Sequence, residues 1–127
     1  MKNLSPLTTH LSPLKEVITD EVDRRFRDAF ESYVRNHISD PSLNVDDIAQ
    51  KLGYGRSRFY RRVQALTGMT PTNYIISVRM EMAKAMLKDD TLSIAEIAYK
   101  LGFNSASYFT CMFKSQTGMS PKEYRTG

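Results

Sequence analysis

The feature that most constrains this sequence is a segment that occurs twice along the chain. Two pairs of runs carry the repeat: Ile48-Ala-Gln-Lys-Leu-Gly53 with Ile97-Ala-Tyr-Lys-Leu-Gly102, and residues 67–74 with residues 117–124. The offset between the copies is 49 residues in the first pair and 50 in the second, so one residue has been added near Asn104. Internal repetition at such a period indicates one supersecondary unit that is built twice.

Each copy carries the signals of two short helices joined by a tight turn. Asn44 can cap the first helix of one copy, and Ser93 with Glu96 has the form of a capping box in the other. Gly53 and Gly102 stand where the chain must leave that helix. Short helices joined by a glycine-containing turn are the helix-turn-helix arrangement. The sequence therefore predicts an all-α fold with tandem helix-turn-helix units over about 44–67 and 93–117.

A longer helix is predicted between the two units, over about residues 71–88. Thr70 and Pro71 supply its cap and its first-turn proline. One side of this helix is expected to carry Ile75, Val78, Met82, Ala85 and Met86. At 1.5 Å per residue it would span roughly 27 Å, and successive major grooves on one side of B-DNA are about 34 Å apart. A rod of this length can hold two reading helices in adjacent grooves.

The N-terminal segment differs in character from the rest. Residues 1–18 contain two Ser-Pro pairs and little periodicity, which predicts a linker or arm and indicates a fragment of a longer protein. From about Asp20 a helix is predicted, with apolar residues at four-residue spacing: Val22, Phe26, Phe30, Val34 and Ile38. Residues 19–127 are thus expected to form one domain of about seven helices.

A helical wheel divides the second helix of each unit into an inward and an outward face. Phe59 and Val63 point inward in the first unit, and Phe109 and Phe113 in the second. In the first unit the candidate DNA contacts on or beside the outward face are Arg56, Ser57, Arg58, Tyr60, Arg61 and Gln64, with Arg62 on a flank. In the second unit they are Ser105, Ala106, Ser107, Thr110, Cys111 and Lys114.

Composition limits the class of protein without identifying it. The sequence has 18 Lys and Arg against 14 Asp and Glu, a net charge of +4 that is compatible with a polyanionic partner but does not establish one. Its single cysteine rules out an internal disulfide and fits a reducing compartment. No apolar run approaches the roughly 20 residues of a membrane span. The chain is therefore expected to be cytoplasmic, without membrane contact of its own.

From about Asp20 to Arg125 the sequence resembles the DNA-binding domain of AraC/XylS-type transcriptional regulators. The signature lies in the run from Leu92 to Phe109, in Phe113-Lys114, and in the run from Gly118 to Arg125. The Ser-Pro lead-in and the first unit also resemble the C-terminal output domain of hybrid two-component regulators of the Bacteroides type. The resemblance implies sequence-specific binding of double-stranded promoter DNA.

Carried over by position, the resemblance implies DNA contacts from both units, but the residues at the matching positions make the two units unequal. In the first, it places base contacts at Ser57, Tyr60 and Arg61, with Arg56 and Arg58 near the backbone or groove edge. In the second, the matching positions hold Ala106, Ser107, Thr110 and Cys111, where several better-studied members carry Gln or Arg. Ala and Cys cannot make the bidentate hydrogen bonds that read purines, so these positions suit a methyl group, a phosphate or DNA shape.

Other classes of function remain as alternatives at this point. An enzyme would need a nucleophile with its base, a metal set or a phosphate-binding loop, and none is recognisable. RNA recognition usually relies on single-stranded loops and aromatic stacking platforms, and no RNP-like strand is recognisable here. A helical protein-interaction module stays open, and binding of double-stranded promoter DNA against competitor DNA would discriminate it. Neither a cofactor nor a metal is expected, since only His10 could join His37 as a histidine ligand. A role for Cys111 as a redox sensor is not favoured, because no basic residue adjoins it in sequence to lower the pKa of its thiol.

The expected partners follow from the same resemblance. Double-stranded DNA is the principal one, and RNA polymerase is kept as a second candidate. The chain is expected to be a monomer in isolation, with dimerisation supplied by other regions of a parent protein. That parent would be anchored in a membrane if it is a hybrid sensor.

Overall fold

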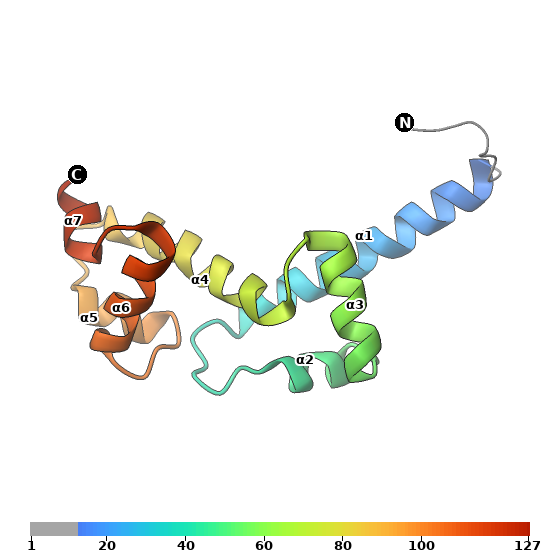
Figure 1. Ribbon diagram of the computed structural model, residues 1–127, viewed down its shortest axis with the longest axis horizontal. Helices are drawn as coiled ribbons and strands as arrows, with labels where there is room; N and C mark the ends of the chain where they lie inside the picture. The colour runs from blue at the N-terminus through green and yellow to red at the C-terminus, as the bar shows by residue number, and fades with distance from the viewer. Residues whose placement is uncertain (1–12) are drawn as a thin grey trace.

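The computed structural model describes residues 13–127, with side chains from Glu21 onward, and this part of the chain is helical throughout (Figure 1). Its seven helices are α1 (Pro13–Asn36), α2 (Val45–Lys51), α3 (Arg56–Thr67), α4 (Pro71–Leu87), α5 (Ile94–Lys100), α6 (Ala106–Thr117) and α7 (Pro121–Thr126). No strand lies between residues 13 and 127. The predicted all-α fold, with two helix pairs joined by a long connecting helix, is confirmed.

Helix α1 begins inside the segment predicted to be a linker. The Ser-Pro pairs predict a linker over residues 1–18, whereas α1 starts at Pro13. Proline disfavours helix in the residue before it, but it is well suited to the first helical position, where its missing N–H has no intrahelical partner to lose. Residues 13–18 are therefore helical, and residues 1–12 of the predicted linker lie outside the described residues.

The two helix-turn-helix pairs are α2–α3 and α5–α6, and their caps follow the sequence. The first unit comprises α1, the loop after it and α2–α3, and the second comprises α5–α6 and α7. The Asp47 N–H donates to the Asn44 side chain at 2.9 Å, and Ser93 and Glu96 form the reciprocal capping box. Hydrogen bonds from the Ser93 backbone N–H and side chain hold the pKa of Glu96 below its usual value. The turns pass through Gly53 (φ +82°) and Gly102 (φ +85°), in the left-handed region that favours glycine.

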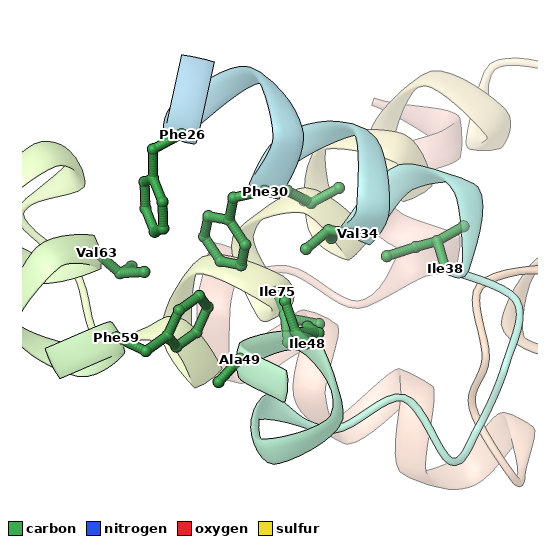
Figure 2. Packing of buried hydrophobic residues seen from close by; sticks show 10 residues of the cluster. Phe26, Phe30, Val34, Ile38, Ile48, Ala49, Phe59, Val63 and Ile75 are labelled. Carbon is green, nitrogen blue, oxygen red and sulfur yellow. The ribbon is translucent and has the colours of Figure 1, made fainter. Parts of the chain in front are cut away.

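The first unit packs around a core that α1 dominates (Figure 2). Phe26, Phe30, Val34 and Ile38 form the buried stripe that the four-residue spacing predicts, while Val22 at its head stays 48% exposed. The rings of Phe30 and Phe59 meet edge to face, with centroids 5.4 Å apart. The other buried members of this core are Ile48, Ala49, Val63, Ile75 and Val78.

The second unit has its own core, and α4 contributes to both. Leu87 near the end of α4 is fully buried, as are Phe109 and Phe113 on α6. The remaining buried members are Met80, Ala83, Ile97, Ala98, Leu101 and Phe103. The N-terminal half of α4 thus covers the first core, and its C-terminal half covers the second.

The predicted apolar side of α4 is wrong in part. Ile75 and Val78 are buried, and Met82 and Met86 pack against the cores, as expected. Ala85 is exposed, and the C-terminal half also buries Ala83 and Leu87. The reason is geometric, because a helix that packs against two different groups of helices presents a different side to each. A single stripe along the whole helix cannot describe it.

Alanine at Gly102 should destabilise the fold far more than alanine at Gly53. Both positions have a left-handed backbone, which disfavours an L side chain by about 1–2 kcal/mol. A Cβ on Gly102 would in addition stand 2.5 Å from the carbonyl oxygen of Ile38 and 2.7 Å from Nη2 of Arg79, whereas one on Gly53 meets nothing within 4 Å. Urea unfolding should show a loss of about 1 kcal/mol for Gly53→Ala and roughly 3 kcal/mol or more for Gly102→Ala. Equal losses would mean that the crowding around Gly102 relaxes freely.

Candidate nucleic-acid interface

Helix α3 presents a polar outward face that its buried side holds in place. Phe59 and Val63 are fully buried in the first core, so the opposite side of α3 is directed to solvent. On that side Ser57, Arg61 and Gln64 are exposed and Tyr60 is half-buried, as the helical wheel predicts. Arg56, Ser57, Tyr60 and Arg61 line a shallow depression on this face.

The arginines at the start of α3 are oriented by neighbouring side chains. The guanidinium of Arg56 lies 5.7 Å from the centroid of the Tyr60 ring, and its Nε is 3.6 Å from a carboxylate oxygen of Asp46. The guanidinium of Arg58 lies 5.3 Å from the centroid of the Tyr54 ring. Arg61 forms no ion pair with any residue from 21 to 127. Three exposed cationic groups are thus available around the outward face of α3.

Arg62 has a different role from the other arginines of α3. Its side chain is only 24% exposed, and Nη2 lies 3.0 Å from a carboxylate oxygen of Asp23 on α1. The guanidinium also lies 5.0 Å from the centroid of the Phe26 ring. Arg62 sits on the flank that faces α1, so it ties α3 to that helix and does not add to the cationic outward face.

Helix α6 presents the corresponding face of the second unit, with fewer charges. Ser107, Cys111 and Lys114 are exposed and Thr110 is half-buried. Two further predicted contacts at the start of the helix are engaged within the protein: Ala106 packs against the second core, and the Ser105 hydroxyl accepts a hydrogen bond from the Tyr108 N–H at 3.1 Å. The outward face of α6 therefore carries small polar groups and one cation.

Tyr108 is an exposed residue of α6 that the sequence reasoning missed. It is 56% exposed, and its ring lies 5.8 Å from that of Phe103, centroid to centroid. The 50-residue offset of the repeat aligns Tyr108 with Arg58, which the helical wheel did identify. Carrying Arg58 across the repeat would have found it.

The two outward faces belong to helices that lie toward opposite ends of α4 (Figure 1). Helix α4 packs against α1 and α3 of the first unit and against α5 and α7 of the second. Its 17 residues span about 26 Å at 1.5 Å per residue. The separation of the units is therefore set by one continuous helix.

The described part of the chain holds neither a metal-binding cluster nor a membrane-spanning helix. Between residues 13 and 127 no cluster of three or more His, Cys, Asp and Glu side chains could hold a metal ion. His37 stacks on Tyr33 with ring centroids 4.1 Å apart, while His10 lies outside the described residues. None of the described helices is both long and apolar enough to cross a membrane.

Replacing Arg62 with alanine should destabilise the fold, whereas the same change at Arg61 should not. Arg62→Ala removes the pair with Asp23 and the contact with Phe26, for an expected loss of about 1–2 kcal/mol in urea unfolding. Arg61 is exposed and forms no ion pair among the described residues, so the free energy of unfolding of Arg61→Ala should stay within about 0.5 kcal/mol of that of the unsubstituted chain. A larger loss for Arg61→Ala than for Arg62→Ala would contradict the assignment of Arg62 to the protein interior.

Comparison with known proteins agrees with this geometry. The family model described as "Helix-turn-helix domain" matches residues 48–127. The histidine kinase P4 of Formosa agariphila is 26% identical over 116 residues, which cover 91% of this chain and 8% of that protein. The chain therefore spans only a small part of the length of this relative.

Solved structures give the same result. The C-terminal domain of the two-component response regulator yesN from Fusobacterium nucleatum is 25% identical with a TM-score of 0.75, covering 80% of this chain and 98% of that one. The DNA-binding domain of AdpA, solved in complex with a target DNA, is 29% identical with a TM-score of 0.71, covering 76% and 86%. With two helix-turn-helix units on one connecting helix and a family match over most of its length, this chain belongs to the AraC-type helix-turn-helix DNA-binding domains.

Proposed function

We propose that this chain is the DNA-binding part of a transcriptional regulator, and that α3 and α6 enter two adjacent major grooves of a specific duplex. The pair of exposed polar faces toward opposite ends of α4 carries the proposal. The major groove admits an α-helix, and successive grooves on one side of the duplex recur about every 34 Å. The likeness to AdpA, whose DNA-binding domain was solved with a target DNA, supports binding to a DNA duplex.

The first unit is proposed to supply most of the hydrogen-bonded recognition. Arg61 and Gln64 are exposed on the outward face of α3, and these residue types read guanine and adenine through paired hydrogen bonds. Ser57 and Tyr60 complete the reading face. Arg56 and Arg58, at the start of the helix, are placed for phosphate contacts.

The second unit is proposed to read DNA by smaller contacts. The methyl group of Thr110 suits a thymine methyl, and Ser107 and Cys111 offer short side chains that let the helix approach the bases closely. Lys114 suits a phosphate. Ser105 and Ala106 contribute mainly by shaping the start of α6. The domain therefore has two units of the same fold, of which the first is proposed to contribute more to sequence recognition than the second.

The role of the whole protein is proposed from its relatives. A histidine kinase matches 91% of this chain, and a response-regulator domain shares its fold, so a signalling protein of the two-component type is the favoured parent. In that setting the domain acts in the cytoplasm at the nucleoid, and the parent supplies dimerisation and any membrane anchor. RNA polymerase is a candidate second partner at the promoter. The chain itself is assigned binding and no catalytic step.

Selection of bound duplexes from a random pool tests the proposed function. The expected product is an asymmetric site with two elements about one helical turn, or roughly 10 base pairs, apart. Because the two units are repeated in tandem along the chain, the elements should form a direct arrangement and not a palindrome. The longer and more strictly required element should be the one that α3 reads. No enrichment over competitor DNA would contradict specific recognition.

Arg61→Ala should weaken binding to the selected duplex by about 1–3 kcal/mol and relax the preference at one base pair. The matched control is Arg27→Ala, which removes an exposed arginine from α1. Fluorescence titration against the selected duplex and its single-base variants measures both effects. An equal loss on all sequences would make Arg61 a phosphate contact, and no loss at all would remove it from the interface.

A further inference from the structure

The two units meet beside α4, where the loop after α1 lies against the turn between α5 and α6. The close contact is at Gly102, since any side chain there would collide with the carbonyl oxygen of Ile38. Residues of both units also line a groove of about 360 Å³ next to this contact, among them Leu43 of the first unit and Phe103 and Tyr108 of the second. The groove leaves this junction incompletely filled by apolar side chains.

One side chain, that of Arg79 on α4, contacts both sides of this junction. Its Nη2 donates to the carbonyl oxygens of Ile38, at 3.4 Å, and Asp40, at 3.3 Å, in the first unit. Its guanidinium lies 5.6 Å from the centroid of the Phe103 ring in the second unit. Burial lowers the pKa of Arg79, and its Nε is buried without a hydrogen-bond partner in the described part of the chain. The guanidinium of Arg79 has thus lost part of its hydration, and only its contacts with the two units offset that loss.

The second unit contains a matched arginine that does not cross the junction. Arg125 on α7 donates to the carbonyl oxygens of Leu87, at 2.9 Å, and Asp89, at 3.2 Å. These two carbonyls stand one 49-residue repeat after those of Ile38 and Asp40. Each unit therefore has an arginine that fastens the loop leading into it. The hydrogen bonds of Arg125 stay within the second unit and the end of α4, whereas Arg79 joins the two units.

The two cores make the junction important. They share α4, whose halves are buried in different clusters, and the groove separates the units on one side of that helix. Bending or twisting of α4 would change the angle between α3 and α6 without opening either core. The contacts of Arg79 with Ile38, Asp40 and Phe103 oppose that motion.

We propose that Arg79 is a positioning residue that sets the angle and distance between α3 and α6, and so determines which spacing of two DNA elements the domain accepts. This inference rests on the proposed two-groove binding. One added base pair moves the second element by about 3.4 Å along the duplex and rotates it by about 34°. A rigid junction cannot follow such a displacement, while a loosened junction can.

The test measures affinity on duplexes that carry the selected site with the spacing between its elements changed by one or two base pairs in either direction. A duplex with the first element alone reports binding that does not depend on the junction. The variants are Arg79→Ala and the bulkier Arg79→Met, with Arg125→Ala as the matched control, each used as the full chain after its cooperative melting has been verified. The measured quantity is the ratio of affinities between the best spacing and its neighbours.

The unsubstituted chain and Arg125→Ala should lose about tenfold or more in affinity for each base pair of displacement. Arg79→Ala and Arg79→Met should reduce this ratio of affinities to within about threefold, while binding the first element alone as tightly as the unsubstituted chain does.

Two results would overturn this inference alone: unchanged discrimination between spacings in a folded Arg79 variant, or an unsubstituted chain that binds specifically yet tolerates every spacing. An unsubstituted chain without sequence preference on any duplex would overturn the proposed function and this inference with it.

Discussion

The structure depends on the burial of α4 between two separate hydrophobic cores. Ile75 and Val78 belong to the core of the first unit, and Ala83 and Leu87 to that of the second. Each helix-turn-helix pair has only short helices of its own, so it buries its apolar face against longer neighbours: α1 and α4 in the first unit, and α4 in the second. Because both cores include residues of α4, the outward faces of α3 and α6 are held at a fixed separation. Under the proposed two-groove binding, packing in the two cores therefore sets the spacing of the DNA elements.

Arginine serves several purposes in this fold, and position decides which. Arg61 is exposed on α3, whereas Arg62, its neighbour in sequence, is turned toward α1 and held by Asp23. Arg79 and Arg125 are directed at backbone carbonyl groups and fasten loops. A count of basic residues therefore overstates the positive charge that faces DNA.

The fold could be predicted because its signals are local and repeated. The capping box of Ser93 and Glu96 and the glycines of the two turns are visible in the sequence, and period-four spacing marks the α1 stripe. Long-range geometry could not be read in the same way. The change of buried side along α4 depends on two packing partners, and the inward turn of Arg62 depends on a helix nearly forty residues earlier, as Asp23 lies 39 positions away. The outward face of α3 was predictable because the two buried residues Phe59 and Val63 fix its orientation on a helical wheel. Tyr108 could have been found only by comparing the two copies of the repeat position by position.

The most direct test of two reading faces held on one helix uses Cys111, the single cysteine of the sequence, which is exposed on the outward face of α6. The measurement is its rate of alkylation by N-ethylmaleimide in the free protein, on the full selected duplex, and on a duplex that ends after the first element. If α3 and α6 occupy adjacent grooves, the full duplex slows alkylation strongly and the shortened duplex leaves it near the rate of the free protein. Equal rates on the two saturated duplexes would show that α6 does not enter the DNA.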